Sequence, residues 1–438
     1  MCGMIQTQLR FDRLSLRANG TSSCYVIAEV TAPPVGPIEN QALRKPLSLA
    51  LVIDASGSMH GSPLSAAKDA VMGISRSLRE GDRLTIVSFD DEVRTFCEGM
   101  LVQRGSAENL ERQLHALTTG GCTNLEKGWR TAVDILKTVD ASGQEYRNQI
   151  VLLTDGHANS GVVCPEQLGV MSRKAYQHHV ITTSAVGIGA YYCEHQIDAM
   201  VRMGGGRLHD AELASEIVPV VMGELEDVSN VVIDNVIVHL HANGPLKIEM
   251  LDESGDEHKF GSMSADSKRR VVYRLTSPGE VVGDHIEVTA TVKWRDTETG
   301  QAHSCATRTK LKFVTDACYD ESFIDKSVIF QVAKVWQQMV VLRATQLNRE
   351  GSYSEAQSYA ANELQRFKKY VGGQRFANKM VAEIELLMSR MGHHMEERMI
   401  KNVRMPMKKM MRGEQEYSNP KEQWTSLMVD RENKRRNR

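Results

Sequence analysis

The stretch Leu47-Ser48-Leu49-Ala50-Leu51-Val52-Ile53-Asp54-Ala55-Ser56-Gly57-Ser58 decides the fold of the region around it. Its largely apolar first part predicts a buried strand, and that strand ends at the carboxylate of Asp54. Two hydroxyls follow at alternate positions, on Ser56 and Ser58. If the chain bends as it leaves the strand, these three side chains turn their oxygens toward one point. Hard divalent cations prefer oxygen clusters of this kind.

Two further segments supply oxygens that could complete such a site. Ile150-Val151-Leu152-Leu153-Thr154-Asp155 is a second short apolar run that ends in an aspartate. In a parallel sheet the carboxyl ends of both runs lie at the same edge, which is where ligands bind in doubly wound sheets. Thr123 lies in the glycine-rich segment Gly120-Gly121-Cys122-Thr123-Asn124 and offers a third hydroxyl from a third loop.

Together these residues resemble the signature of a von Willebrand factor type A domain with a metal-ion-dependent adhesion site. The signature is Asp-x-Ser-x-Ser followed by a distant threonine and a distant Asp-Gly. The resemblance implies that Ser56, Ser58 and Thr123 bind the metal directly, while Asp54 and Asp155 act directly or through water. Mg²⁺ suits such a site, because it keeps several waters and needs few carboxylates, and Mn²⁺ and Ca²⁺ are the alternatives.

The same resemblance implies a function in protein–protein interaction. The metal would keep one coordination position for an acidic residue of a protein partner, and the protein would act as a scaffold or adaptor in a multi-protein complex. We expect the surrounding loops to form the rim that contacts this partner. The residues expected on the rim are Met59, His60, Asn124, His157, Tyr191 and Tyr192.

Two alternatives compete with this interpretation. Asp54 and its serines could instead cap the helix that follows, because Asp and Ser are favoured at helix N-caps. Asp54 could also be the nucleophile of a metal-assisted hydrolase or phosphotransferase. An aspartyl-phosphate enzyme of the dehalogenase type would carry a second carboxylate at position 56, where this chain has Ser56. The sequence also lacks a phosphate-binding loop and a Gly-x-Ser-x-Gly nucleophile elbow. We therefore favour binding without catalysis.

Around this motif, strand patterns alternate with helical ones, which predicts an α/β fold with a doubly wound, mostly parallel sheet. The expected strands are 47–54, 83–89, 148–155, 180–189 and 207–210, and the expected helices are 62–78, 125–139, 165–177, 195–203 and 212–225. After the turn residues Asp90-Asp91-Glu92, residues 93–100 should form an antiparallel strand at the edge of the sheet.

The flanking regions alternate apolar and polar residues and predict a β-sandwich. Two runs at the N-terminus, 5–16 and 23–30, are separated by the hairpin signal Asn19-Gly20. Two strands cannot bury a core alone, so we expect them to join the later strands and the type A domain to be inserted into the sandwich. The later strands are expected at 231–241, 246–251, 270–275, 286–294 and 302–313.

From Phe323 onward the apolar residues recur at helical spacing, and Gly351-Ser352-Tyr353 and Gly372-Gly373 divide the pattern into three helices. The last 41 residues hold twelve Lys or Arg against five Asp or Glu, which predicts a basic and partly disordered tail. Nucleic acid and anionic lipid are alternative partners for that tail. The resulting layout is N-terminal strands at 1–45, the type A domain at 46–227, the sandwich at 228–318, a helical bundle at 319–400 and a flexible, methionine-rich tail at 401–438.

Composition narrows the class further. The 438 residues carry a net charge of −2, and no apolar run reaches membrane-spanning length. The first twenty residues lack the pattern of a secretion signal. The eight cysteines include no Cys-x-x-Cys pair, so we expect most of them to be buried, reduced thiols. The layout resembles that of bacterial cytosolic proteins, so the expected location is the cytoplasm.

Overall fold

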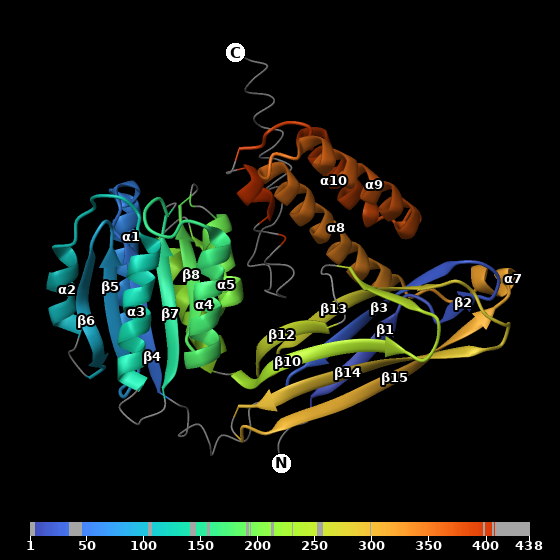
Figure 1. The fold of residues 1–438 in the computed structure, drawn as a ribbon, viewed down its shortest axis with the longest axis horizontal. Coiled ribbons are helices and arrows are strands. Elements are labelled where there is room, and N and C mark those ends of the chain that lie inside the picture. Colours follow the sequence, from blue (N-terminus) through green and yellow to red (C-terminus); the bar gives the residue numbers. More distant parts are fainter. Residues whose placement is uncertain are drawn as a thin grey trace. The chain divides into compact units, whose positions relative to one another are not determined.

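The computed structural model describes residues 5–34, 46–103, 107–140, 146–155, 158–189, 192, 194–211, 214–229, 231–251, 257–297, 299–396, 399–404 and 407. The chain divides into two compact units (Figure 1). The first unit joins Met1–Gly36 to Val231–Arg438, and the second is Pro37–Asn230. Within the described residues, no helix combines the length and apolar composition needed to cross a membrane.

The second unit is built on a six-stranded sheet in the order β6-β5-β4-β7-β8-β9. All neighbouring pairs are parallel except β5 and β6, so the predicted antiparallel edge strand is confirmed. The strands in the middle of the sheet are buried because helices cover both faces. Their bounds are β4 Leu47–Asp54, β5 Arg83–Phe89, β6 Val93–Leu101, β7 Arg147–Thr154, β8 Thr182–Ile188 and β9 Gly205–Ala211.

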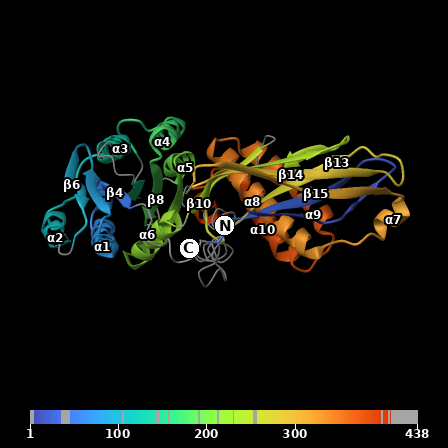
Figure 2. The same cartoon turned by 90° about the horizontal axis from the view of Figure 1, so that it is seen from below.

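Helices lie on both faces of this sheet (Figure 2). One face packs against α1 Ser62–Ser77, α2 Ala107–His115 and α6 Ala214–Ser229, whose apolar residues share a buried cluster with those of β4 and β5. The other face is covered by α3 Leu125–Asp140, α4 Pro165–His179 and α5 Glu194–Met203. The expected α/β fold class is confirmed, and α2 is an addition that the sequence pattern did not predict.

The first unit contains a sandwich of two sheets. One sheet has the order β1-β3-β13-β11 and the other the order β12-β10-β14-β15-β2. Their inward-facing side chains form one buried cluster. The strands are β1 Gln6–Phe11, β2 Ser15–Arg17, β3 Ser22–Thr31, β10 Val231–Ala242, β11 Lys247–Met250, β12 Glu257–Ser264, β13 Lys268–Ser277, β14 His285–Asp296 and β15 Ala302–Val314.

The N-terminal strands belong to this sandwich. β3 pairs antiparallel with β1 on one side and with β13 on the other, while β2 pairs parallel with β15. The predicted hairpin at Asn19-Gly20 is wrong, because β2 and β3 lie in different sheets. The first run of the sequence is also divided, since Leu16 of β2 turns into the core as part of the second sheet.

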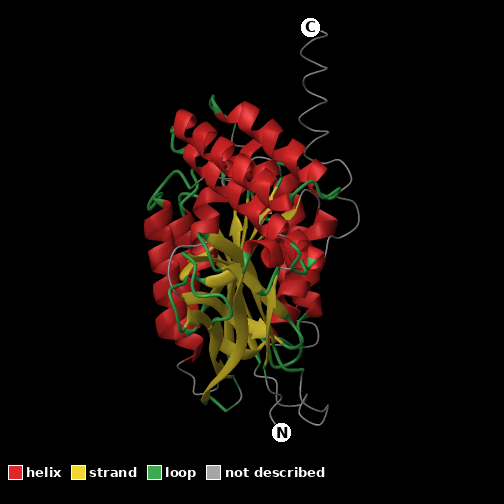
Figure 3. Ribbon diagram, turned by 90° about the vertical axis from the view of Figure 1, so that its right-hand side faces the viewer, coloured by secondary structure: helices red, strands yellow, loops and turns green. Residues whose placement is uncertain are grey.

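Three helices follow the sandwich, as predicted: α8 Lys326–Arg349, α9 Tyr353–Val371 and α10 Ala377–Met391. A short helix, α7 Asp316–Asp320, precedes them. The three helices pack on the outer face of the sheet that contains β3 (Figures 1 and 3). Tyr25 and Ile27 of β3 lie in the same buried cluster as Trp336 of α8.

The start of the expected tail is not flexible. Ile400, Val403 and Met407 are buried among the helices, and Arg404 donates a hydrogen bond to the Leu342 carbonyl at 2.9 Å. These apolar side chains continue the helical core, so Val403 and Met407 belong to the folded unit and not to a flexible tail. Residues 408–438 lie outside the described residues.

The prediction that most cysteines are buried is wrong, because only one of the six described thiols is buried and three are partly exposed. Cys24 is buried, but Cys122 and Cys318 are exposed, because the first lies in the loop before α3 and the second in the short helix α7. All six are free thiols.

Candidate metal centre

The strands β4 and β7 bring two carboxylates to the same edge of the sheet. They are parallel neighbours with Ile53 opposite Leu153, so Asp54 and Asp155 leave the sheet side by side. Every residue of β4 is buried, and Asp54 has no exposed surface. Asp155 is half-buried. The expected convergence of these two aspartates is therefore present in the structure.

Hydrogen bonds connect the two aspartates through the serines. The Ser56 amide donates to Asp54 Oδ1 at 2.9 Å, and the Ser56 and Ser58 hydroxyls lie 3.1 Å apart. Ser58 donates to Asp155 Oδ1 at 2.8 Å. On the other side, the Thr154 hydroxyl donates to Asp54 Oδ2 at 2.5 Å. Three hydroxyls and two carboxylates are thus connected in one chain, in which the Ser56 backbone amide forms the link to Asp54.

The loop with Thr123 packs directly against this chain. The Gly120 amide donates to the Ala55 carbonyl at 2.9 Å, and the Gly57 amide donates to the Gly121 carbonyl at 3.4 Å. Thr123 is only 3% exposed. Among the described residues, no hydrogen bond joins its side-chain hydroxyl to another group. The three segments expected from the sequence therefore meet at one place, and Thr123 brings an uncommitted hydroxyl.

The electrostatics of this place favour a cation. Burial raises the pKa of Asp54 to about 6, hydrogen bonds from Ser56 and Thr154 lower it, and the neighbouring Asp155 raises it. Burial also raises the pKa of Asp155, and the Ser58 hydroxyl opposes that shift. Neither carboxylate forms an ion pair with a described lysine or arginine. Two adjacent, desolvated carboxylates without a positive partner are costly, and a bound cation would remove that cost.

The donor set fits a hard divalent cation. It consists of two carboxylates and three hydroxyls, and oxygen ligands with few carboxylates suit Mg²⁺. Among the described residues, this site included, no group of three or more His, Cys, Asp or Glu side chains could hold a metal ion, so a cation here would depend on hydroxyl ligands as well. The candidate ligands are Asp54, Ser56, Ser58, Thr123 and Asp155.

The capping alternative is wrong. Helix α1 begins at Ser62, its N-cap is Gly61, and no side chain caps it. The short 3₁₀ turn Gly57–Met59 likewise has no side-chain hydrogen bond at its N-cap, Ser56. The aspartate and serine side chains bond to one another instead.

Part of the expected partner rim must be corrected. Met59 has no exposed surface and Tyr192 is 3% exposed, so neither side chain can reach a partner. Met59 packs in the apolar cluster between the sheet and α1, which removes it from the rim. His60 is exposed and Asn124 is partly exposed. His157 and Tyr191 lie outside the described residues.

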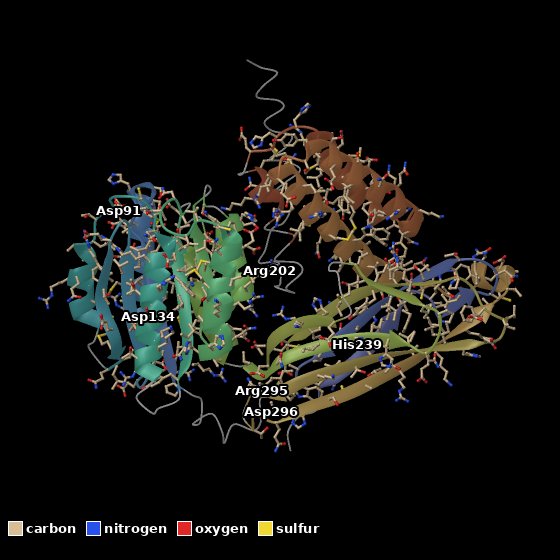
Figure 4. The ribbon with its side chains drawn as sticks, in the orientation of Figure 1. Asp91, Asp134, Arg202, His239, Arg295 and Asp296 are labelled. Atoms are coloured by element: carbon tan, nitrogen blue, oxygen red, sulfur yellow. The ribbon has the colours of Figure 1, made fainter. Side chains whose placement is uncertain are left out.

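Several residues at the site were not found from the sequence. Asp91 lies among the loops at this end of the sheet (Figure 4), where its Oδ1 accepts from the Cys122 amide at 3.1 Å. Thr154 binds Asp54, and its position directly before Asp155 on a neighbouring strand was a usable signal. Asn159 bonds to the Thr123 backbone, and Gln196 bonds to Ala158 and Val163 on either side of Asn159; no spacing in the sequence indicates these contacts.

Comparison with known proteins identifies the class of this unit. Residues 47–210 match the family model of the von Willebrand factor type A domain, so this part of the chain is such a domain. The protein sll0103 of Synechocystis, described as uncharacterized, is 26% identical over 280 residues, which is 59% of this chain and 64% of that protein. Human inter-alpha-trypsin inhibitor heavy chain H3 is 30% identical over 139 residues, which is 30% of this chain and 15% of that protein. The match thus spans less than two thirds of each relative.

Two solved structures share the fold over most of the chain. The von Willebrand factor type A protein of Catenulispora acidiphila has a TM-score of 0.58 at 14% identity, and the match covers 86% of this chain and 89% of that one. The ArnB paralog VWA2 of Sulfolobus acidocaldarius has a TM-score of 0.53 at 14% identity, with 92% and 98% covered. At this identity the likeness concerns the fold alone.

Proposed function

We propose that the type A domain binds one divalent cation through Asp54, Ser56, Ser58, Thr123 and Asp155, and that this cation binds an acidic residue of a protein partner. The observation that carries the proposal is that two carboxylates and two serine hydroxyls are linked at one place, with the Thr123 loop packed against them and no ion pair from a described lysine or arginine to either carboxylate. Type A domains typically mediate protein–protein interactions, which supports the same reading. Mg²⁺ is the cation that this donor set favours.

The acidic nature of the partner group follows from the ligands. The three hydroxyls are neutral ligands, so where the two aspartates act through water the cation would stay strongly electrophilic. A partner carboxylate would then form a short, charge-assisted contact in place of water. His60 and Asn124 are the expected rim residues that stand at the surface there. A role as a scaffold or adaptor in the cytoplasm stays a prediction.

Binding without catalysis is supported by the position of Asp54. A nucleophilic carboxylate must reach its substrate, but Asp54 is fully buried and both of its oxygens accept hydrogen bonds. An attack by this carboxylate would require both bonds to break and the strand end to open. The geometry therefore favours a ligand that orients the site over a nucleophile.

Titration of the metal-free protein with Mn²⁺ in a calorimeter tests the site. We expect one Mn²⁺ per chain in the wild type and at least about tenfold weaker binding in Ser58→Ala, which is a loss of roughly 1.4 kcal/mol. Ser58 is exposed, so this change should leave the fold intact. Ser65→Ala, which removes an exposed serine hydroxyl from α1, is the matched control and should bind as the wild type does. Equal affinity in Ser58→Ala and Ser65→Ala would refute the assignment.

The partner role needs a separate measurement. A protein captured from native cells in the presence of Mg²⁺ should be released by chelator and should not be captured by Ser58→Ala. Replacing one acidic residue of that protein should have the same effect. A partner that is retained equally in chelator and by Ser58→Ala would show that the metal does not form the interface.

A further inference from the structure

A loop joins Thr123 to helix α5 through two side-chain amides. The first belongs to Asn159: its side-chain Oδ1 accepts from the Thr123 backbone amide at 2.7 Å, and its backbone amide donates to the Thr123 carbonyl at 3.1 Å. The Ser160 amide adds a third bond to the same carbonyl at 3.3 Å. Both sides of the Thr123 backbone are therefore held by two consecutive residues of one loop.

The second amide belongs to Gln196, in the first turn of α5. Its Oε1 accepts from the Ala158 amide at 3.0 Å, and its Nε2 donates to the Ala158 carbonyl at 3.1 Å and the Val163 carbonyl at 2.8 Å. Gln196 is only 9% exposed, and both polar atoms of its side chain are used. The loop on either side of Asn159 is thereby fixed to a helix of the domain.

The same loop also lies close to Asn124, the residue that follows Thr123. Gly161 has a φ of 70°, and a Cβ atom on it would lie 2.5 Å from Asn124 Oδ1. That same oxygen accepts from the Lys127 amide at the start of α3. A side chain at position 161 would be strained by the positive φ and would displace the Asn124 side-chain amide from its bond to Lys127, so both features favour glycine.

We infer that Asn159 and Gln196 are positioning residues of the metal centre, which hold the backbone of Thr123 so that its hydroxyl stays directed at the cation. The inference rests on the proposed function, since it gives these amides a role at the same site. Metal ligands on loops need such support, because outer partners that orient a ligand commonly change metal affinity by about 10- to 100-fold. Within the part of the chain that the structure describes, no side-chain hydrogen bond fixes the Thr123 hydroxyl.

The competing explanation is that these bonds only stabilise the domain. Gln149 provides the comparison, because it is a buried glutamine of the same domain that donates to Ser184 on the neighbouring strand. It lies on β7 opposite Thr182, at the start of the strands, whereas the metal centre lies at their carboxyl ends. Removing the Gln149 amide should therefore lower stability without affecting Thr123.

The experiment compares Asn159→Ala, Asn159→Asp, Gln196→Met and Gln149→Met in the full chain. Mn²⁺ affinity is measured by calorimetry, and melting temperature and hydrogen exchange at the Thr123 segment are measured without metal. We expect Asn159→Ala to weaken Mn²⁺ binding about 10- to 100-fold and Gln196→Met about 5-fold or more. Both should speed exchange at Thr123. Asn159→Asp keeps the acceptor for the Thr123 amide and should restore the affinity to within about 3-fold of wild type.

The outcomes separate this inference from the proposed function. If the wild type binds Mn²⁺ and Asn159→Ala and Gln196→Met change only the melting temperature, as Gln149→Met should, the positioning role is overturned and the metal site stands. Failure of Asn159→Asp to restore affinity would also overturn it, because the acceptor is then not what matters. A wild type that binds no Mn²⁺ overturns the proposed function and this inference together.

Discussion

Gly121 shows how a single residue shapes the candidate metal centre. Its φ of 60° lies in the left-handed region, and a Cβ atom there would lie 2.1 Å from Asp91 Oδ2. Its carbonyl accepts from the Gly57 amide, and its neighbour Cys122 donates to Asp91. The loop can therefore approach both the serine segment and the Asp91 turn only if this position has no side chain.

Gly121→Ala should consequently lower stability by about 1–3 kcal/mol, because strain and a clash add together. It should also weaken Mn²⁺ binding, since Thr123 lies two residues away. Gly223→Ala is the control: Gly223 lies inside α6 with no atom within 4 Å of an added Cβ. That change should raise stability by about 0.5–1 kcal/mol. Urea unfolding measures both, and equal effects of the two changes would contradict the account of Gly121.

The buried carboxyl group of Asp12 should make the stability of the first unit depend on pH. The residue is 4% exposed and its Oδ1 accepts from the Tyr25 amide at 2.9 Å. Burial raises its pKa to about 6, against the lowering effect of that hydrogen bond. The pKa of Asp12 is thus higher in the folded protein than in the unfolded chain. Protonated Asp12 therefore contributes its full stabilisation of the fold below about pH 4, and this contribution is lost as the pH rises through 6.

On going from pH 7.5 to pH 5, Asp12 should therefore add roughly 1.4 kcal/mol to the free energy of unfolding of the first unit. Asp12→Asn keeps an acceptor for the Tyr25 amide and should lose this gain. Other titrating groups cancel in the difference between the two proteins at each pH. A difference that stays constant from pH 7.5 to 5 would show that Asp12 does not titrate in this range.

At the scale of secondary structure, the sequence predicts elements best where burial sets the pattern. β4 is buried throughout and β7 is buried in all but its first residue, so their apolar runs, and the aspartates where these runs end, indicated the candidate metal centre. β12 was missed because most of its residues are only half-buried and it contains Gly261, which weakens the alternation. The division of residues 5–17 between two sheets was also missed, since both parts alternate in the same way and only tertiary packing separates them.

The sequence also did not indicate the residues that bond to the backbone near Thr123, because their contacts depend on the tertiary fold. Asn159 and Gln196 lie in a loop and a helix that approach Thr123 only in the folded domain, and side-chain amides occur in many surroundings. Met59 and Tyr192 were wrongly predicted to contact a partner. Their nearness in sequence to the loops of the candidate site suggested exposed side chains, whereas both side chains are buried.

The segment after α10 gives a prediction at this scale. Ile400, Val403 and Met407 are each at most 2% exposed and pack in the helical core. A chain that ends after Glu396 loses all three, and burial of such side chains contributes about 1.5–3 kcal/mol each. We expect the first unit to lose on the order of 5 kcal/mol and to melt at a clearly lower temperature. A chain that ends after Met411 keeps these contacts and is the control, and equal melting of the two would contradict the assignment.

At the scale of the whole molecule, the type A unit interrupts the sandwich in sequence. β3 pairs with β1 and β13, so the first unit needs strands from both ends of the chain. The second unit has its own buried cluster, which draws only on residues between Leu47 and Leu225. Each unit should therefore fold by itself, provided that all of its strands are present.

The last prediction tests this dependence. Residues 46–229 alone should unfold in one cooperative transition, because the sheet and its six helices are complete. Residues 231–411 alone should aggregate, since the absence of β3 exposes Val271 and Leu275, which are at most 1% exposed in the intact protein. Adding residues 5–34 back, joined before Val231 by a flexible linker, should restore a soluble unit that melts cooperatively, as followed by circular dichroism and light scattering. If residues 231–411 alone are soluble and melt cooperatively, the N-terminal strands are dispensable and the sandwich does not depend on both ends of the chain.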